Sequence, residues 1–263
     1  MKPSLILHPV SYSPSGKSAL AQALALARLY QADLHILEVR GRRVFSNDPI
    51  IRPFSHGGVE PHLAEFVEPV GSTGARVSVV ELAGDAVAAV VDYARQASAD
   101  LVVVAANARS HGPYWRPGAY ANDLARHLSC PVLSVPVPRG GDALPSGPPF
   151  TNILGATDLS DASATVVEQA SSLAHQTGAA LAFVQGVTSQ SIIGTASNNG
   201  SDLIVIGRQD RSATNHVIMN STTAKVLREA RCSVLVLPAQ RTEGALIASE
   251  STAALTEPAF AHR

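Results

Sequence analysis

Residues 201–206, Ser-Asp-Leu-Ile-Val-Ile, repeat the pattern of residues 99–104, Ala-Asp-Leu-Val-Val-Val, at an offset of 102 positions. In each stretch an aspartate precedes four apolar residues in a row. Such a run is typical of a strand that is buried on both faces of a parallel sheet. Residues 232–235 (CSVL) match residues 130–133 (CPVL) at the same offset, so the second part of the chain repeats the first.

The start of the repeat has a different offset. Residues 153–158 match residues 6–11, and residues 179–184 match residues 32–37, both at an offset of 147 positions. The second copy is therefore 45 residues shorter than the first. The missing length falls between Val187 and Gln190, where the first copy has a long loop and a strand at 77–82. We expect the lost strand to be an edge strand, because loss of a central strand would leave its neighbours unpaired.

Strand and helix patterns alternate along the first copy. Apolar runs at 5–7, 34–39, 77–82, 101–105 and 131–135 alternate with helical spacing of apolar residues over 18–30, 85–96 and 120–128. The sequence therefore predicts an α/β protein of two tandem, doubly wound domains with mainly parallel sheets. We predict a first domain at 1–138, a Gly/Pro-rich linker at 139–149, a truncated second domain at 150–240 that lacks about one strand and one helix, and a flexible tail at 241–263.

Composition narrows the function classes. The chain of 263 residues is 46% hydrophobic, which suits a folded protein, and its net charge of −1 gives no general field for nucleic acid or an anionic membrane. Two cysteines cannot form a disulfide framework, so we predict a cytoplasmic protein. We expect no signal peptide and no transmembrane helix, because the apolar runs are too short.

One motif offers an enzymatic alternative. Gly16-Lys17-Ser18 lies between a predicted strand and a helix, as the end of a phosphate-binding P-loop does. The opening glycine is absent, because Ser11 stands in its place, and no acidic residue for Mg²⁺ follows the strand at 101–105. The simpler interpretation is a helix start capped by serines, with Lys17 in solvent. Replacing Lys17 by Ala would reduce activity only in a P-loop phosphotransferase.

A second motif follows the repeated strand that ends near Gly207. A helix pattern begins with Asn220-Ser221-Thr222-Thr223, and residues 231–237 (RCSVLVL) form the last strand pattern. This arrangement resembles the universal stress protein family. Nucleotide-binding members of that family carry G-x2-G-x9-G-[ST] after the fourth strand and an Asp after the first. The resemblance covers most of residues 4–238 and implies two domains with the adenine nucleotide alpha hydrolase-like fold.

The resemblance implies a damaged nucleotide motif in the second copy. Gly207 matches the first glycine, Asp210 replaces the second, Asn220 replaces the third and Ser221 matches the hydroxyl. A carboxylate at 210 would repel a polyphosphate unless Mg²⁺ or a cation intervened. Asp158 matches the aspartate after the first strand. The implied nucleotide-binding candidates are Asp158, Gly207, Arg211, Ser221 and Thr222.

The first copy departs further from the family motif. Ala105 and Ala108 replace the first two glycines, Gly118 is kept, Ala119 removes the hydroxyl and Ser11 replaces the aspartate. These departures favour a non-enzymatic stress-response protein that acts through protein contacts and has no cofactor. The alternative is a regulator that binds ATP with Mg²⁺ in the second domain only.

The remaining candidates for chemistry are weak. His56 and His62 have no third ligand at metal spacing, and no catalytic residues can be assembled from the sequence. Cys130 and Cys232 hold equivalent positions before the last strand of each copy, where cysteine is commonly a small buried residue.

The resemblance also implies that the last strands, at 131–135 and 233–237, pair the two domains pseudo-symmetrically within the chain. A homodimer and unidentified protein partners are further expectations, and the kind of stress is not encoded in the pattern.

Overall fold

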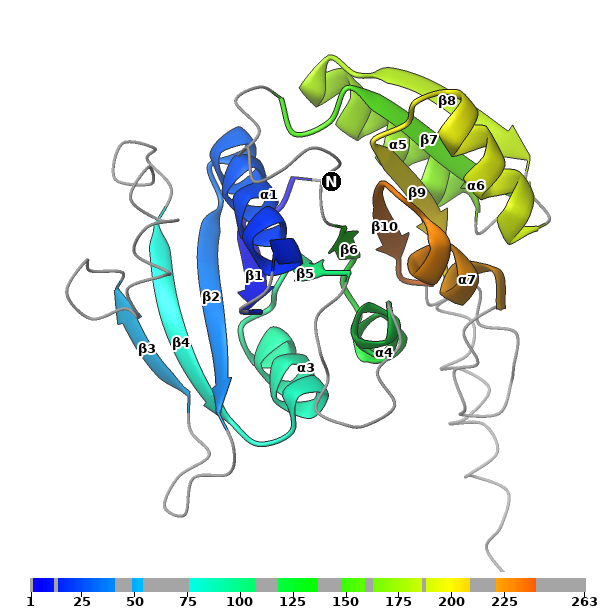
Figure 1. The fold of residues 1–263 in the computed structure, drawn as a ribbon. Helices are drawn as coiled ribbons and strands as arrows, with labels where there is room; N and C mark the ends of the chain where they lie inside the picture. The colour runs from blue at the N-terminus through cyan, green and yellow to red at the C-terminus, as the bar shows by residue number, and fades with distance from the viewer. Residues whose placement is uncertain are drawn as a thin grey trace, which may run out of the picture.

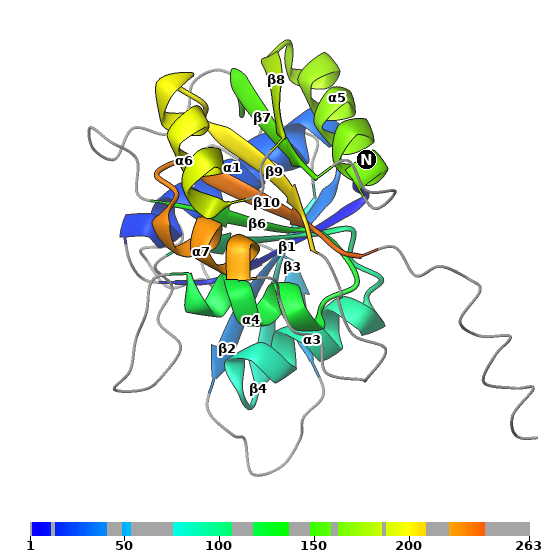
Figure 2. The same ribbon diagram turned by 90° about the vertical axis from the view of Figure 1, so that its right-hand side faces the viewer.

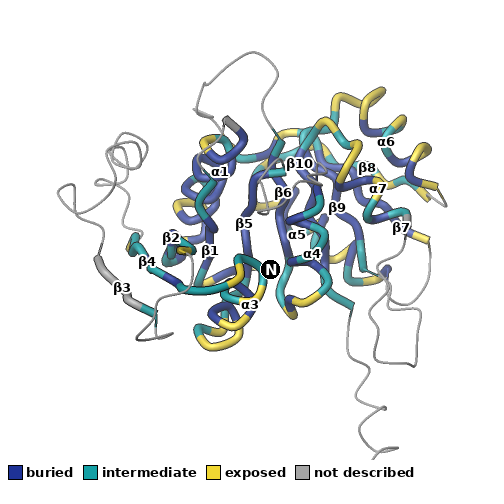
Figure 3. Tube along the Cα trace, turned by 60° about the horizontal axis from the view of Figure 1, so that its bottom comes forward, coloured by how far each residue is buried: buried dark blue, intermediate teal, exposed yellow. Residues whose placement is uncertain are grey.

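In the part of the chain that the structure describes, ten strands form one continuous sheet in the order β3-β4-β2-β1-β5-β6-β10-β9-β7-β8 (Figure 1). We analysed a computed structural model, which describes residues 2–11, 14–40, 49–53, 76–106, 118–136, 148–158, 163–185, 188–208 and 221–239. The sheet is mainly parallel, and the central strands are buried, as the dark blue of β5, β6 and β10 in Figure 3 shows. The predicted mainly parallel α/β architecture is confirmed.

Each half of the sheet is built from one copy of the repeat. The first half contains β1 (Leu5–Pro9), α1 (Pro14–Tyr30), β2 (Asp33–Arg40), β3 (Ile50–Pro53), β4 (Val77–Ala83), α3 (Ala86–Gln96), β5 (Leu101–Ala105), α4 (Ala119–His127) and β6 (Val132–Val135). The second half contains β7 (Asn152–Thr157), α5 (Ala164–Thr177), β8 (Ala180–Gln185), α6 (Ser189–Asn198), β9 (Leu203–Gly207), α7 (Ser221–Glu229) and β10 (Ser233–Leu237).

Helices cover the sheet in two groups (Figure 2). Helices α3, α4, α7 and α6 contact one another in that order, whereas α1 and α5 pack on the strands of their own halves. The connection from β1 to β2 and the connection from β4 to β5 run in opposite directions along the sheet. Because such crossovers are right-handed, α1 and α3 lie on opposite faces.

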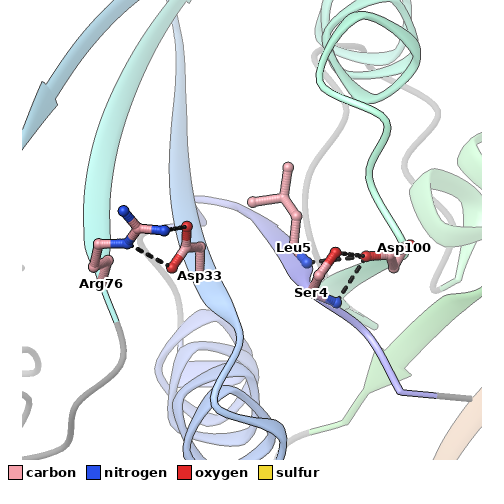
Figure 4. A network of polar contacts seen from close by, with 5 residues as sticks. All are labelled: Ser4, Leu5, Asp33, Arg76 and Asp100. Carbon is pink, nitrogen blue, oxygen red and sulfur yellow. Dashed lines mark hydrogen bonds and ion pairs between the residues drawn. The ribbon is translucent and has the colours of Figure 1, made fainter.

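The start of each half is fixed by an aspartate. In the first half, one oxygen of Asp100 accepts hydrogen bonds from Ser4 N at 2.8 Å, Ser4 Oγ at 2.6 Å and Leu5 N at 3.0 Å (Figure 4). On the neighbouring strands, Arg76 donates to both carboxylate oxygens of Asp33, at 3.1 and 2.9 Å. These contacts hold the amino ends of four neighbouring strands in register.

The second half repeats the aspartate contact. Asp202, at the offset of 102 from Asp100, accepts from Thr151 N at 2.7 Å, Thr151 Oγ1 at 2.6 Å and Asn152 N at 3.1 Å. The Ser-Asp and Ala-Asp starts of the two repeated stretches therefore have one structural cause. Asp100 ties the start of β1 to the start of its neighbour β5, and Asp202 ties the start of β7 to the start of its neighbour β9.

The two halves join through β6 and β10, which pair antiparallel. Leu133 lies opposite Leu235, Val132 opposite Val236, and Ser134 opposite Val234. Leu133 and Leu235 are themselves equivalent at the offset of 102, so a local two-fold axis passes through this pair. The predicted pseudo-symmetric pairing of the last strands is confirmed.

The shortening of the second half falls on an edge, as predicted. In the first half β4 lies beyond β2, whereas in the second half β8, the counterpart of β2, ends the sheet. Among the described helices, α5, α6 and α7 match α1, α3 and α4. Residues 54–75 of the first half lie outside the described residues, so the predicted loss of a helix stays a prediction. In the second half α6 begins soon after β8, directly after its N-cap residue Thr188.

The predicted domain boundaries at 1–138 and 150–240 stay predictions, and one cluster of buried apolar residues runs through both halves. The proposed tail at 241–263 and most of the linker at 139–149 lie outside the described residues. Within the described residues, no helix has the length and apolar character needed to cross a membrane.

Candidate functional site

Each half of the sheet has a switch point, where successive connections leave a strand in opposite directions. In the first half α1 leads from β1 towards β2, while β5 lies on the other side of β1. In the second half β7 has β8 on one side and β9 on the other. The carboxyl ends of the strands at such a switch point are where open α/β sheets bind ligands. The candidate sites are therefore the carboxyl ends of β1 and β5, and those of β7 and β9.

In the second half, two predicted site residues end neighbouring strands. Asp158 directly follows β7, and Gly207 is the last residue of β9, which pairs with β7 in parallel. Asp158 is exposed, and one of its carboxylate oxygens accepts a hydrogen bond from Ser163 Oγ at 2.5 Å. The same hydroxyl accepts from Asp158 N at 3.2 Å. Ser163 therefore fixes this carboxylate at the start of α5.

Gly207 has a packing role. A Cβ at this position would lie 3.3 Å from Val166 Cγ2 of α5, which is tighter than ordinary van der Waals contact. Its carbonyl oxygen accepts a hydrogen bond from Thr223 Oγ1 at 3.4 Å, which links the end of β9 to the first turn of α7. Thr222 in the same turn is partly exposed. Ser221 begins α7, while its side chain and all of Arg211 lie outside the described residues.

In the first half, the helix start is closed onto the preceding strand. Gly16 lies in the first turn of α1, and a Cβ there would lie 1.7 Å from the carbonyl oxygen of Ser11. Gly16 and Ser11 correspond to Ser163 and Asp158 at the offset of 147. Where the second half has a hydroxyl-carboxylate bond, the first half has direct backbone packing. Gly16 is thus required by the fold, and Lys17 beside it is exposed, as the capped-helix interpretation predicts.

The glycine kept at the third motif position of the first half serves the contact between halves. Gly118 caps α4 in the left-handed conformation, with φ of 74°. A Cβ at this position would lie 2.7 Å from the carbonyl oxygen of Leu227 in α7. Only glycine combines this backbone conformation with such a close approach.

The helix carbonyl on the other side of the axis is contacted by an arginine. Ala125 in α4 is equivalent to Leu227 at the offset of 102. Arg208, which directly follows β9, donates from its guanidinium to the carbonyl oxygen of Ala125 and to that of Leu128 at 3.3 Å. On each side of the local two-fold axis, one half therefore contacts a helix carbonyl of the other half. Gly118 lies against Leu227, and the Arg208 side chain reaches α4 of the first half.

Two further titratable groups have shifted pKa values, the buried His8 and the half-buried Cys130. His8 in β1 is buried, and its Nδ1 donates to the carbonyl oxygen of Val103 at 2.9 Å. Burial lowers the pKa of His8 to about 4, so the ring is neutral at neutral pH. Sequence reasoning missed His8; the signal was its replacement by Gly155 at the equivalent position. Burial also raises the pKa of Cys130 to about 11, which gives an unreactive thiol.

No group of three His, Cys, Asp or Glu side chains gathers at metal-binding distance within the described part of the chain. His56 and His62 lie outside it.

The sequence model of the universal stress protein family matches residues 4–136 and 183–238, which is more than half of the chain. The chain belongs to the universal stress protein family. No curated protein matches it significantly in sequence. The two matched segments, one in each half, confirm two universal stress protein regions in tandem.

Solved structures show the same fold over nearly the whole chain. A Pseudomonas aeruginosa UCBPP-PA14 structure titled as a universal stress protein is 18% identical, covers 96% of this chain and 98% of its own, and has a TM-score of 0.67. A universal stress protein from Archaeoglobus fulgidus DSM 4304 is 15% identical, covers 92% of this chain and 98% of its own, and has a TM-score of 0.66. A functionally unknown protein from Pseudomonas aeruginosa PAO1 is 18% identical, with coverage of 96% and 97% and a TM-score of 0.65.

The nucleotide implied by the family fits the two halves differently. In the first half β5 ends at Ala105, which Ala106 follows, and Gly118 at the α4 cap lies against Leu227 of α7, so these residues do not fit a triphosphate. In the second half Asp158 is exposed and Thr222 is partly exposed. These two residues are of a type that can contact a ribose and a phosphate.

Proposed function

We propose that this universal stress protein acts in the cytoplasm without catalysis, through contacts with other proteins, and that its nucleotide sites have degenerated. One observation carries the proposal. At each retained motif position that the structure describes in detail, a contact within the protein accounts for the residue. Gly118 faces Leu227, Gly207 faces Val166, and Asp158 is bonded to Ser163.

The argument is one of economy. A glycine that is kept so that a phosphate can approach the backbone faces open space in the free protein. Gly118 and Gly207 instead face protein atoms at 2.7 and 3.3 Å from a Cβ position. Their retention is explained by packing. Ser221 keeps the motif hydroxyl in the second half, while Asp210 and Asn220 replace its other two glycines. Cys130 and Cys232 do not form a disulfide, which supports a reducing compartment.

The test is direct. Mass spectrometry of small molecules released by denaturing the purified protein should detect no adenine nucleotide, and titration calorimetry with ATP and Mg²⁺ should show no heat of binding. Co-purified ATP or ADP, or saturable heat that Ser221→Ala weakens, would contradict the proposal.

A second candidate function is an ATP-binding regulator that uses only the second half. The exposed Asp158 after β7 and the partly exposed Thr222 in the first turn of α7 favour it. For this function, Asp158→Ala should weaken ATP binding measured by calorimetry. Ser11→Ala at the equivalent position of the first half is the matched control and should leave binding unchanged. Lys17→Ala should also have no effect, because only a P-loop mechanism uses that amine.

A further inference from the structure

The outer strand of the second half has the composition of a buried strand. β8 reads Ala-Leu-Ala-Phe-Val-Gln, without a charged residue, yet none of its residues is buried. Its counterpart β2 is an internal strand with fully buried Leu34 and Ile36. Phe183, the counterpart of Ile36, is 43% exposed. An apolar strand at an exposed edge is a site for strand addition.

The exposed strand β8 has fewer polar residues than its internal counterpart β2. Asp33, His35 and Glu38 of internal β2 correspond to Ala180, Ala182 and Gln185 of edge strand β8. Edge strands of soluble proteins are ordinarily protected by charges or proline. The charged side chains are therefore absent from the strand that would need them if it stayed uncovered.

The backbone of β8 also has unused pairing groups. Ala180 N donates to the carbonyl oxygen of Thr151 on the β7 side. Successive peptide groups of a strand point to opposite sides, so the N–H groups of Leu181, Phe183 and Gln185 point away from β7. In the part of the sheet that the structure describes, no strand lies beyond β8 (Figure 1).

One exposed apolar side chain lies on β8, and another lies on the helix that packs against it. Among the described residues, the exposed large hydrophobics are Leu29, Val167 and Phe183. Phe183 belongs to β8, and its ring lies where a side chain of Gly155 on β7 would be. Val167 belongs to α5, the helix that contacts β8, and is 42% exposed. An added strand would pair with the outward-pointing peptide groups and would lie beside Phe183.

We propose that β8 is the interface of a homodimer, in which β8 of a second copy adds to it antiparallel. The two ends of the sheet differ in a way that selects this partner. β3, at the other end, has only four residues and includes Arg52 and Pro53, which lacks an N–H. Pairing of β8 with β3 would be head-to-tail and would not close, whereas pairing of β8 with itself closes at two copies.

Self-pairing also continues an interface that the chain already contains. The halves are joined by the antiparallel pair of the uncharged strands β6 and β10 across a local two-fold axis. A β8 pair would extend the same sheet by the same kind of operation. Because β8 has no charge, the pair brings no like charges together.

The proposal predicts that the wild-type protein has twice the chain mass of 27.3 kDa in sedimentation equilibrium and light scattering. A charge at the centre of β8, in Phe183→Glu, should give the monomer mass. Leu29→Glu is the matched control, because Leu29 is 36% exposed on α1, and it should stay dimeric. A mixture of Phe183→Glu and Phe183→Lys proteins should recover the dimer through opposite charges, which a folding defect would not allow.

Hydrogen exchange of the wild-type protein tests the same interface without a variant. The amides of Leu181, Phe183 and Gln185 should be protected at high protein concentration and lose that protection on dilution. A monomeric wild type would overturn the proposal and leave the edge for a strand of a different protein. A dimer that survives Phe183→Glu, or that Leu29→Glu dissociates equally, would overturn it too. Nucleotide binding affects none of these readouts, so they are independent of the proposed function.

Discussion

At the residue scale, one carboxylate fixes the start of each half. Asp100 accepts three hydrogen bonds from Ser4 and Leu5, which hold the beginning of β1 against that of β5. Replacing Asp100 by Ala should lower the free energy of unfolding by about 2 kcal/mol, because hydrogen bonds to a charged acceptor are lost. Urea unfolding measures this. Asp92→Ala, which removes a solvent-exposed ion pair with Arg95, is the control and should change stability little.

The same residue makes stability depend on pH. Burial raises the pKa of Asp100, but the hydrogen bonds from Ser4 and Leu5 lower it by more and leave it below the ordinary 3.8. A carboxyl group with a lowered pKa in the folded state stabilises above its unfolded pKa and loses this contribution as pH falls through the folded value. The difference between wild type and Asp100→Ala should therefore be constant near neutral pH and shrink below about pH 4. A difference that grows on acidification would contradict this assignment.

His8 acts in a higher pH range. Burial lowers its pKa from 6.5 to about 4, while the hydrogen bond to Val103 opposes the shift only in part. The unfolded chain binds a proton between these values and the folded chain does not, so acidification from pH 6.5 to 4 destabilises the fold by about 3 kcal/mol. His8→Leu should remove this slope, although it also removes one hydrogen bond. Urea unfolding midpoints measured between pH 6.5 and pH 4 test this. An equal dependence of the midpoint on pH in both proteins would refute the prediction.

At the element scale, Gly118 connects the cap of α4 to α7. Ala at this position meets a left-handed backbone and a Cβ position 2.7 Å from the carbonyl oxygen of Leu227. Gly178→Ala is the matched control, because Gly178 has φ of 70° and open space around its Cβ position. Both variants lose about 1 kcal/mol through the backbone alone. Gly118→Ala should lose clearly more in urea unfolding, and an equal loss would show that the helix contact adds nothing.

Elements with a local cause were predictable from sequence, whereas their tertiary contacts were not. The apolar runs predicted β5 and β9, and the shift of offset located the segment that the second half omits. The contact of Arg208 with Ala125 joins residues 83 positions apart. It depends on how α4 packs against the end of β9, which no local pattern records. The motif glycines likewise suggested phosphate binding, and only the packing around them gave Gly118 and Gly207 another role.

At the scale of the whole molecule, the halves share one sheet and one apolar core, so they should unfold together. The sequence predicted the strands that join them, because these strands end both copies of the repeat. It did not predict that the shortened half would leave an uncharged edge at β8. The exposure has two causes: the strand that would lie beyond β8 is lost, and the residues of β8 are uncharged. The second cause is visible only when β8 is compared with its equivalent strand β2.

The last prediction concerns the pair of leucines on the local two-fold axis. Leu133 and Leu235 face each other across the β6–β10 pair and are 1% and 3% exposed. Each Leu→Ala change should lower the free energy of unfolding by about 2–5 kcal/mol, with similar values because the axis relates the two sites. Because the two leucines lie directly opposite each other, the loss of stability in the double variant should deviate from the sum of the single losses by about 0.5–3 kcal/mol.

The matched control for this cycle is the pair Leu7 and Leu154, which are equivalent in the two copies and fully buried. Their strands, β1 and β7, are separated in the sheet by β5, β6, β10 and β9. Their Ala variants should therefore add within about 0.5 kcal/mol in urea unfolding. Additivity at Leu133 and Leu235 as well would mean that the seam contributes no direct contact energy. The halves would then be held together by the helix contacts at Gly118 and Arg208.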